Sequence, residues 1–141
     1  MKLLRQLSPV WILRITLGAM YVFSGQDLMR HPTAWHWAMP LWLREMISSV
    51  VSLNTYLKFQ GAVEIIFALV LLAWFLKPVI VRIVAALSTL ELIGILILAF
   101  APWNETNFLI TFRDIGLVGA SLALWIMLTK EKSLSHGTTG E

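Results

Sequence analysis

Two apolar stretches give the clearest indication of the fold of this chain. They are residues 57–76, LKFQGAVEIIFALVLLAWFL, and residues 78–100, PVIVRIVAALSTLELIGILILAF. Each is a strongly apolar stretch near the length of about 20 residues that a helix needs to cross the hydrocarbon core of a bilayer. Only Lys77 separates them, and Pro78 disfavours helix in the residue before it but opens a new helix well. The two stretches therefore predict two membrane-spanning helices joined by a tight turn.

Two further stretches, residues 7–26 and 107–128, are also long enough to span. The composition agrees, because 58% of the 141 residues are apolar and only 13% are charged, whereas a soluble domain carries about 25% charged residues. A chain of this length leaves too little sequence for two ordinary domains. We therefore predict an all-α membrane protein whose residues 1–128 form a four-transmembrane-helix bundle, with spans at residues 7–26, 57–76, 78–100 and 107–128.

The connection between the first two predicted spans is long and rich in tryptophan. Residues 33–50 mix apolar side chains with a few charged ones, a composition typical of a short helix lying in the membrane interface. The last residues, 129–141, are rich in Ser, Thr and Gly. We predict an interfacial helix at residues 33–50 and a disordered cytoplasmic tail at residues 129–141.

The basic residues predict the orientation. With four spans both termini lie on one side, and that side collects Lys2, Arg5, Lys77, Arg82, Lys130 and Lys132, whereas the other side has Arg30, Arg44 and Lys58. Because Lys and Arg are enriched on the cytoplasmic side, we expect both termini in the cytoplasm and the Trp-rich connection outside. The expected location is the inner (plasma) membrane of a prokaryote, with the lipid bilayer as the first partner.

Several kinds of activity are excluded or disfavoured. The formal net charge of +3 comes from Lys and Arg residues that are spread along the chain, so we expect no nucleic-acid partner. The chain has no cysteine, which excludes thiol chemistry and cysteine-ligated clusters. His31 and His36 are separated by Pro32 and have no third strong ligand nearby, so we predict no metal site.

The ionisable and amide residues inside the spans are the candidate site, because charge within a bilayer is costly and usually paired or functional. The candidates for binding or for a polar cluster are Gln60, Glu64, Glu91, Arg113, Asp114 and Asp27. Counting residues from the helix ends places Glu64 and Asp114 roughly 10 Å below the outer face. We expect a polar pocket open to the outside and partly roofed by the Trp-rich connection, with Arg113 paired to Glu64 across helices.

Other intramembrane residues favour a structural role. Arg14 and Arg82 lie in the inner half, where long side chains can snorkel to the headgroups and fix topology. Gly18 and Gly25 lie on one face of the first span, and Gly116 and Gly119 begin small-x-x-x-small pairs in the last span, so we expect both sets to allow close helix packing. Interhelical pairing alone also remains open as an explanation for the carboxylates.

The chain resembles the DoxX-like family of small four-helix membrane proteins over approximately residues 10–128. The matching residues are Arg14, Gly18, Ser24 and Gly25 in the first span, Gly61 and Glu64 in the second, Arg82 in the third, and Phe112, Arg113, Asp114 and Gly116 in the fourth. Gln26 and Asp27 depart from the family, which usually has a lysine close behind the glycine. The resemblance implies this fold and association with membrane oxidoreductase assemblies, with quinone as an open cofactor.

Three functions follow as hypotheses. The first is an accessory or anchoring subunit of a quinone-linked redox complex, with a membrane redox protein as partner and without intrinsic catalytic activity. The second is a stand-alone protein that binds or transports a lipid, a quinone or a small anion in the polar pocket. The third is an enzyme that uses Glu64 or Asp114 as a proton donor. A homo-oligomer is open in each case.

Overall fold

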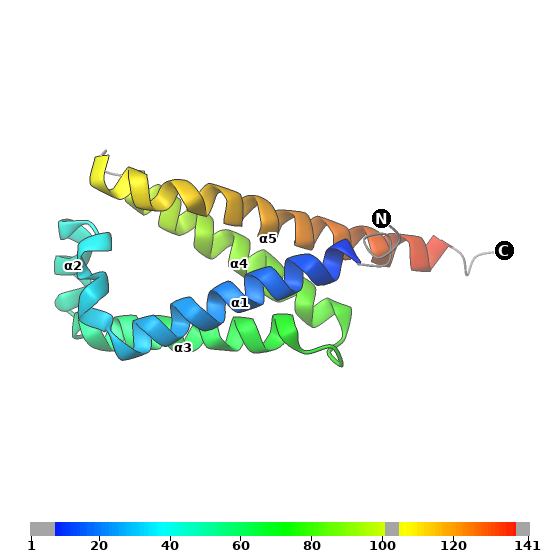
Figure 1. Ribbon diagram of the computed structural model, residues 1–141, viewed down its shortest axis with the longest axis horizontal. Helices are drawn as coiled ribbons and strands as arrows, with labels where there is room; N and C mark the ends of the chain where they lie inside the picture. Colours follow the sequence, from blue (N-terminus) through cyan, green and yellow to red (C-terminus); the bar gives the residue numbers. More distant parts are fainter. Residues whose placement is uncertain (1–7, 101–104, 138–141) are drawn as a thin grey trace.

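The computed structural model describes residues 8–100 and 105–137, with side chains for residues 8–98 and 114–130. All the secondary-structure elements in this part of the chain are helices. Its elements are, in chain order, α1 Pro9–Arg30, the 3₁₀ helix η2 Pro32–Ala38, α2 Leu41–Ser48, α3 Leu53–Leu72, α4 Pro78–Phe100 and α5 Glu105–Gly137 (Figure 1). The prediction of an all-α protein is confirmed for these residues.

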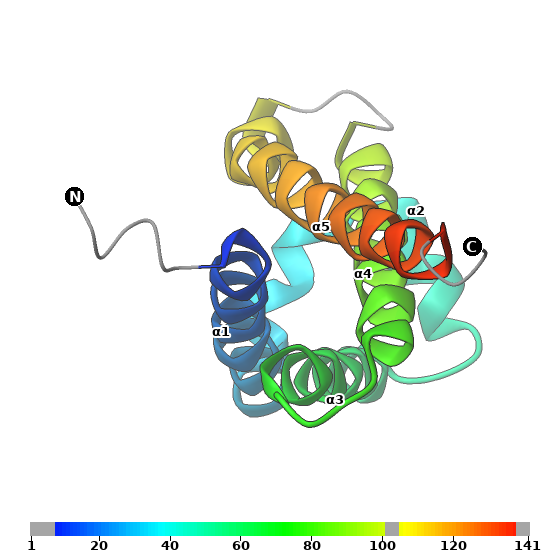
Figure 2. The same ribbon diagram turned by 90° about the vertical axis from the view of Figure 1, so that its right-hand side faces the viewer.

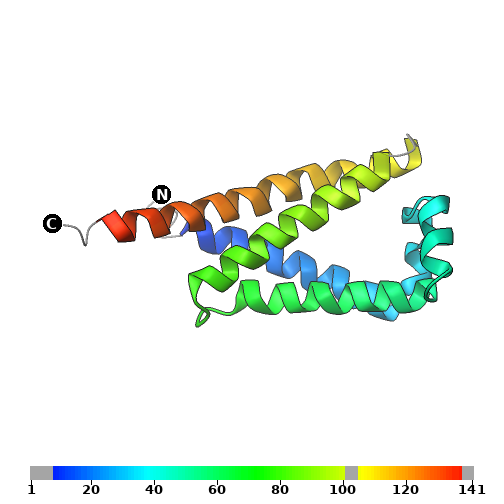
Figure 3. The same ribbon diagram turned by 180° about the vertical axis from the view of Figure 1, so that it is seen from behind.

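The long helices form two pairs. α1 lies along α3, and α4 lies along α5 (Figures 1 and 3). The pairs are close together at the end where α3 leads into α4, and they diverge toward the end that carries η2 and α2. Seen along its length, the molecule has the four helices arranged around a central axis, with α2 behind them (Figure 2). α1 begins and α5 ends at the same end of the molecule.

Local sequence explains where these helices begin and end. Pro9 and Pro78 open α1 and α4, because proline has the backbone φ of a helix and lacks an N–H that a first turn would leave unsatisfied. The Ser52 hydroxyl accepts a hydrogen bond from the backbone N–H of Thr55 at 3.2 Å and so caps α3. α1 ends at Arg30, directly before His31 and Pro32.

Three of the four predicted spans have different boundaries in the structure, and α1 runs from Pro9 to Arg30 rather than from residue 7 to 26. α4 spans Pro78–Phe100 as the sequence predicts, but α3 runs from Leu53 to Leu72 rather than from residue 57 to 76. The Ser52 cap starts α3 early, and the extended backbone of Ala73 ends it before the predicted turn. The connection between α3 and α4 is therefore residues 73–77 rather than Lys77 alone.

The interfacial segment and the tail also differ from expectation. Residues 33–50 hold two short helices, η2 and α2, which Met39 and Pro40 separate, where one helix was predicted. α5 continues to Gly137, so residues 129–137, where a disordered tail was predicted, extend this helix. Lys130, Glu131 and Lys132 are good helix formers, and no glycine or proline stops the helix before Gly137. Residues 138–141 lie outside the described part of the chain.

The glycines divide into two groups. A Cβ on Gly18 would lie 2.7 Å from Leu72 Cγ, and a Cβ on Gly25 would lie 2.7 Å from the Gly61 carbonyl oxygen, so both allow α1 to approach α3 closely. Around Gly116 and Gly119 no atom of the described residues lies within 4 Å of such a Cβ. The prediction of close packing at these two glycines is wrong within this chain, because α5 turns Ser121 and Leu124 toward its neighbours instead.

Two helices, Leu53–Leu72 in α3 and Pro78–Leu98 in α4, are long and apolar enough to cross a membrane. The outer faces of all four long helices carry exposed large apolar side chains, among them Ile15, Phe59, Leu69, Leu90, Ile97 and Ile126. Apolar surface of this extent is unusual on a soluble monomer and indicates contact with lipid or protein.

Candidate functional site

A cavity of about 870 Å³ lies where the two helix pairs diverge. All four long helices line it, and η2 and α2 also contribute to its wall. The predicted contribution of the Trp-rich connection is thus present, through Trp35, Met39 and Leu43. Five of the six predicted polar residues lie in this wall: Asp27, Gln60, Glu64, Glu91 and Asp114. The Arg113 side chain lies outside those described, so its predicted pairing with Glu64 stays a prediction.

The first polar group of the wall is centred on Glu91 of α4. Tyr21 of α1 donates a hydrogen bond from Oη to Glu91 Oε2 at 3.0 Å, and its hydroxyl lies 2.6 Å from Ser88 Oγ. Gln60 of α3 donates from Nε2 to Glu91 Oε1. Because these residues come from α1, α3 and α4, this network joins the two helix pairs at the cavity, and both Glu91 oxygens have neutral donors.

The second polar group is Glu64 of α3. This residue is only 5% exposed, and its Oε2 atom is buried with no hydrogen-bond partner among the described residues. The Ser24 hydroxyl on α1 hydrogen-bonds to the same carboxyl group. A buried acceptor without a donor is costly in a folded protein and usually marks a place where another molecule or a water belongs.

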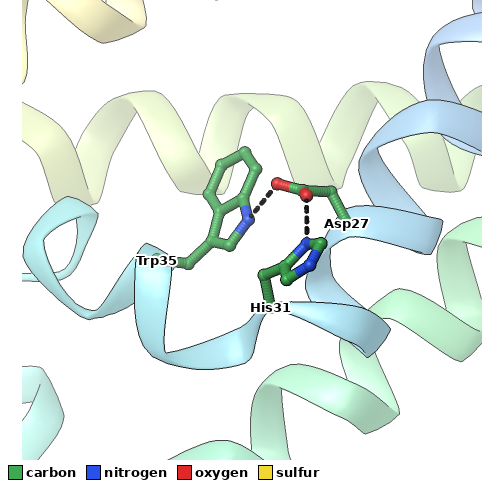
Figure 4. Close-up of polar contacts among 3 residues, drawn as sticks. All are labelled: Asp27, His31 and Trp35. Atoms are coloured by element: carbon green, nitrogen blue, oxygen red, sulfur yellow. Dashed lines mark hydrogen bonds and ion pairs between the residues drawn. The ribbon is translucent and has the colours of Figure 1, made fainter.

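The third polar group lies where α1 meets η2 (Figure 4). Asp27 Oδ1 lies 2.9 Å from His31 Nδ1, and Asp27 Oδ2 accepts a hydrogen bond from Trp35 Nε1 at 2.8 Å. The hydrogen bond with His31, followed by that from Trp35, lowers the pKa of the Asp27 carboxyl below its usual range. All three residues line the cavity. His36 of η2 is not part of the cavity wall, and its Nε2 lies 2.8 Å from Asn54 Oδ1 of α3.

Most of the ionisable groups in the wall are carboxyl groups. Among the described lining residues, four carry carboxyl groups (Asp27, Glu64, Glu91 and Asp114), and Arg30 carries the single guanidinium. The rest of the wall is largely apolar, with Met20, Phe23, Leu28, Leu57, Leu92, Ile95, Leu98 and Leu117 among its side chains. A mostly apolar cavity with a few convergent polar groups is the usual form of a small-molecule site.

Arg14 has a different role from the one predicted for it. Its side chain is buried rather than extended toward headgroups, and it donates from Nε to the Leu71 carbonyl at 2.8 Å and from a terminal nitrogen to the Ala73 carbonyl at 2.7 Å. The guanidinium also lies 4.1 Å from the ring centre of Trp11. Arg14 therefore caps the C-terminal end of α3, where a cation is favourable for the helix dipole. Arg82 is half-buried.

Sequence reasoning did not single out Tyr21, Ser24, Ser88 or Trp35 as individual members of the site. A signal was present for one of them, because Ser88 and Glu91 are three residues apart and so share a helix face. Gln60 and Glu64, four residues apart, share a face of α3 in the same way. Tyr21 has no comparable signal, because its partners are distant in the sequence. No group of three or more His, Asp or Glu side chains that could hold a metal ion occurs among the described residues.

No protein-family model, curated protein or solved structure matches this chain.

Proposed function

We propose that this chain is a DoxX-like integral membrane protein with four spans that binds an amphipathic small molecule in the cavity between its two helix pairs. One observation carries the proposal. Five polar residues from α1, α3, α4 and α5, most of them intramembrane, lie in the wall of one cavity whose remaining surface is largely apolar. Ionisable groups within a membrane-embedded bundle are expected to face such an interior and to mark a binding site or pathway.

The arrangement of the helices supports four spans. α3 and α4 are the two helices whose length and composition suit a membrane. α1 and α5 lie side by side with them along their length, so a bilayer that contains α3 and α4 also surrounds α1 and α5. The 22 residues of α1 and the 33 of α5 are enough to cross it.

The same arrangement supports the proposed orientation. α1 begins and α5 ends at one end of the molecule, and the distribution of Lys and Arg favours the cytoplasm for that end. η2 and α2 then lie at the outer face of a prokaryotic inner membrane. Their exposed apolar side chains, Trp37, Leu41, Trp42 and Met46, suit the interface between headgroups and acyl chains.

The wall favours some ligands over others. Carboxyl groups outnumber the Arg30 guanidinium in it, which disfavours the small anion that the sequence left open. A long apolar lining suits a lipid, a quinol or another molecule with an acyl or isoprenoid body. We therefore propose a neutral or cationic amphiphile as the ligand class.

Native mass spectrometry of the protein released from lipid nanodiscs tests this proposal. Ile93 and Ile95 are both 37% exposed and both on α4, but only Ile95 lines the cavity. We expect wild type and Ile93→Trp to retain one non-protein molecule per chain and Ile95→Trp to lose it. Equal retention in all three proteins would contradict binding in the cavity.

An accessory or anchoring role in a quinone-linked redox complex is the second candidate, and the resemblance to the DoxX-like family supports it. The α5 face around Gly116 and Gly119 is open, so a helix of a partner subunit can approach it closely. Extraction in a mild detergent followed by native electrophoresis tests this role. Migration of the chain alone, without an enriched redox protein, would contradict it.

A further inference from the structure

We propose that the cavity selects an amphiphile whose head group is a protonated amine, and that Glu64 Oε2 accepts its hydrogen bond. This inference rests on the proposed function, namely that the cavity binds a small molecule. It goes further because it names the head group and the atom that recognises it.

The first observation is the state of the two inner carboxyl groups. Glu91 is satisfied within the protein, because Tyr21 and Gln60 donate to its two oxygens. Glu64 differs, because its Oε2 is buried without a partner among the described residues although the residue lines the cavity. A ligand that donates a hydrogen bond at this position therefore removes an unfavourable feature of the unliganded protein.

The second observation is the charge around that atom. Glu64 and Glu91 line the same cavity, whereas Asp27 in the same wall is already bonded to His31 and Trp35. Gathering carboxylates in an apolar environment is unfavourable unless a cation accompanies them. An ammonium group supplies both the positive charge and up to three N–H donors, and a charge-assisted hydrogen bond to a carboxylate is stronger than a neutral one. A quinone head group offers only acceptors, so it cannot donate a hydrogen bond to Oε2 of an ionised Glu64.

The predicted pairing of Arg113 with Glu64 is compatible with this site. A single-point contact from a guanidinium uses one carboxylate oxygen, and the other oxygen keeps its capacity to accept. Of the two Glu64 oxygens, Oε2 is the one left without a donor by the described residues.

The third observation is that apolar side chains line the same cavity as the two carboxyl groups. Leu57 of α3 and Leu92 and Ile95 of α4 line the same cavity as Glu64 and Glu91. Such a wall suits an alkyl chain attached to the ammonium group, because burial of apolar surface adds to the binding free energy.

The experiment compares octylamine, 1-octanol and octanoate, which have one alkyl chain and three head groups. Each is titrated against the purified full chain, and the bound fraction is read by native mass spectrometry. We expect octylamine to bind most tightly and octanoate least tightly. Glu64→Gln is expected to weaken octylamine by about 10- to 100-fold, the loss of one charge-assisted hydrogen bond, and to leave octanol within about twofold.

Three controls make the result specific. Glu45→Gln carries the same substitution at an exposed residue of α2 outside the cavity wall and is expected to bind like wild type. Glu64→Asp keeps a carboxyl group and is expected to keep the preference for the amine. Retained octanol binding shows that Glu64→Gln is folded. If Glu64→Gln loses octanol binding, the test rests on Glu64→Asp, and loss of the amine preference in Glu64→Asp contradicts the inference.

The outcomes separate this inference from the proposed function. If Ile95→Trp blocks all three compounds but octylamine is not preferred, or if Glu64→Gln leaves octylamine unchanged, the amine site is wrong and cavity binding stands. If Ile95→Trp weakens none of the compounds, cavity binding itself is wrong.

Discussion

Gly25 of α1 and Gly61 of α3 face each other so closely that a Cβ on either residue would lie 2.7 Å from the carbonyl oxygen of the other. This contact sets the distance between the two helices directly beside the cavity, because Ser24 and Gln60, their neighbours in the chain, both line it. Small residues that let helix backbones approach are the usual means of packing in a membrane, where water provides no drive between helices.

Gly25→Ala and Gly61→Ala should therefore destabilise the protein. The added methyl group meets backbone, so the helices must separate, and overpacking of this kind costs about 1–3 kcal/mol. Gly94→Ala is the matched control, because no atom lies within 4 Å of a Cβ there, and it should be neutral or stabilise by up to about 1 kcal/mol through helix propensity. Thermal unfolding in detergent micelles measures the three variants. A melting temperature that falls equally in all of them would contradict the close contact.

Arg14→Met should destabilise the protein far more than Arg82→Met. Arg14 donates to the Leu71 and Ala73 carbonyls at the end of α3, and hydrogen bonds from a charged group contribute about 1.5–3 kcal/mol each. Arg82 is half-buried and makes no hydrogen bond to the described residues. Unfolding of the two variants by a denaturing detergent provides the comparison. Equal loss of stability would favour the snorkelling role that the sequence predicts for both arginines.

Tyr21→Phe should loosen the contact between the helix pairs. The substitution removes the hydroxyl that bonds Ser88 and Glu91. It leaves the buried Ser88 and the half-buried Glu91 with one partner fewer each, at a cost of about 1–3 kcal/mol. Tyr56→Phe is the control, because Tyr56 also lines the cavity but makes no hydrogen bond with the described side chains. Thermal unfolding of both variants tests this difference, and an unchanged melting temperature for Tyr21→Phe would show that the network is unimportant for stability.

The contact between α1 and η2 should weaken in acid. The pKa of Asp27 is lowered in the folded protein, so its stabilising effect is fully present above the unfolded carboxyl pKa of about 3.9 and is lost as the pH falls through the folded value. Iodide quenching of Trp35, taken as the difference between wild type and Trp35→Phe, should rise as the pH is lowered past about 4. Asp27→Asn should show the higher quenching at neutral pH and little further change. A flat profile in wild type would contradict this role of Asp27.

The sequence predicts the helices better than it predicts their partners. Pro78 locates the start of α4, because proline acts on its own backbone and on the residue before it. The grouping of Asp27, Gln60, Glu64, Glu91 and Asp114 around one cavity was also predictable, since depth in the membrane follows from position along a helix.

The features that sequence reasoning missed depend on contacts between distant residues. The two hydrogen bonds by which Arg14 caps α3 connect it to residues that lie 57 and 59 positions later in the chain. The hydrogen bond between Tyr21 and Glu91 spans 70 positions. Helix periodicity gives the face of a side chain but not the helix that it meets. For the same reason the sequence did not show that Gly116 and Gly119 face away from the other helices.

The most direct test of small-molecule binding in the cavity is a structure of crystals grown from a lipid mesophase, with the native lipids retained. Binding in the cavity predicts density for a non-protein molecule between α3 and α4, with its polar end within hydrogen-bond distance of Glu64 and its chain along Leu92 and Ile95. Helix pairs closed against each other, with Glu64 and Glu91 bonded to protein groups and no space between them, would contradict it.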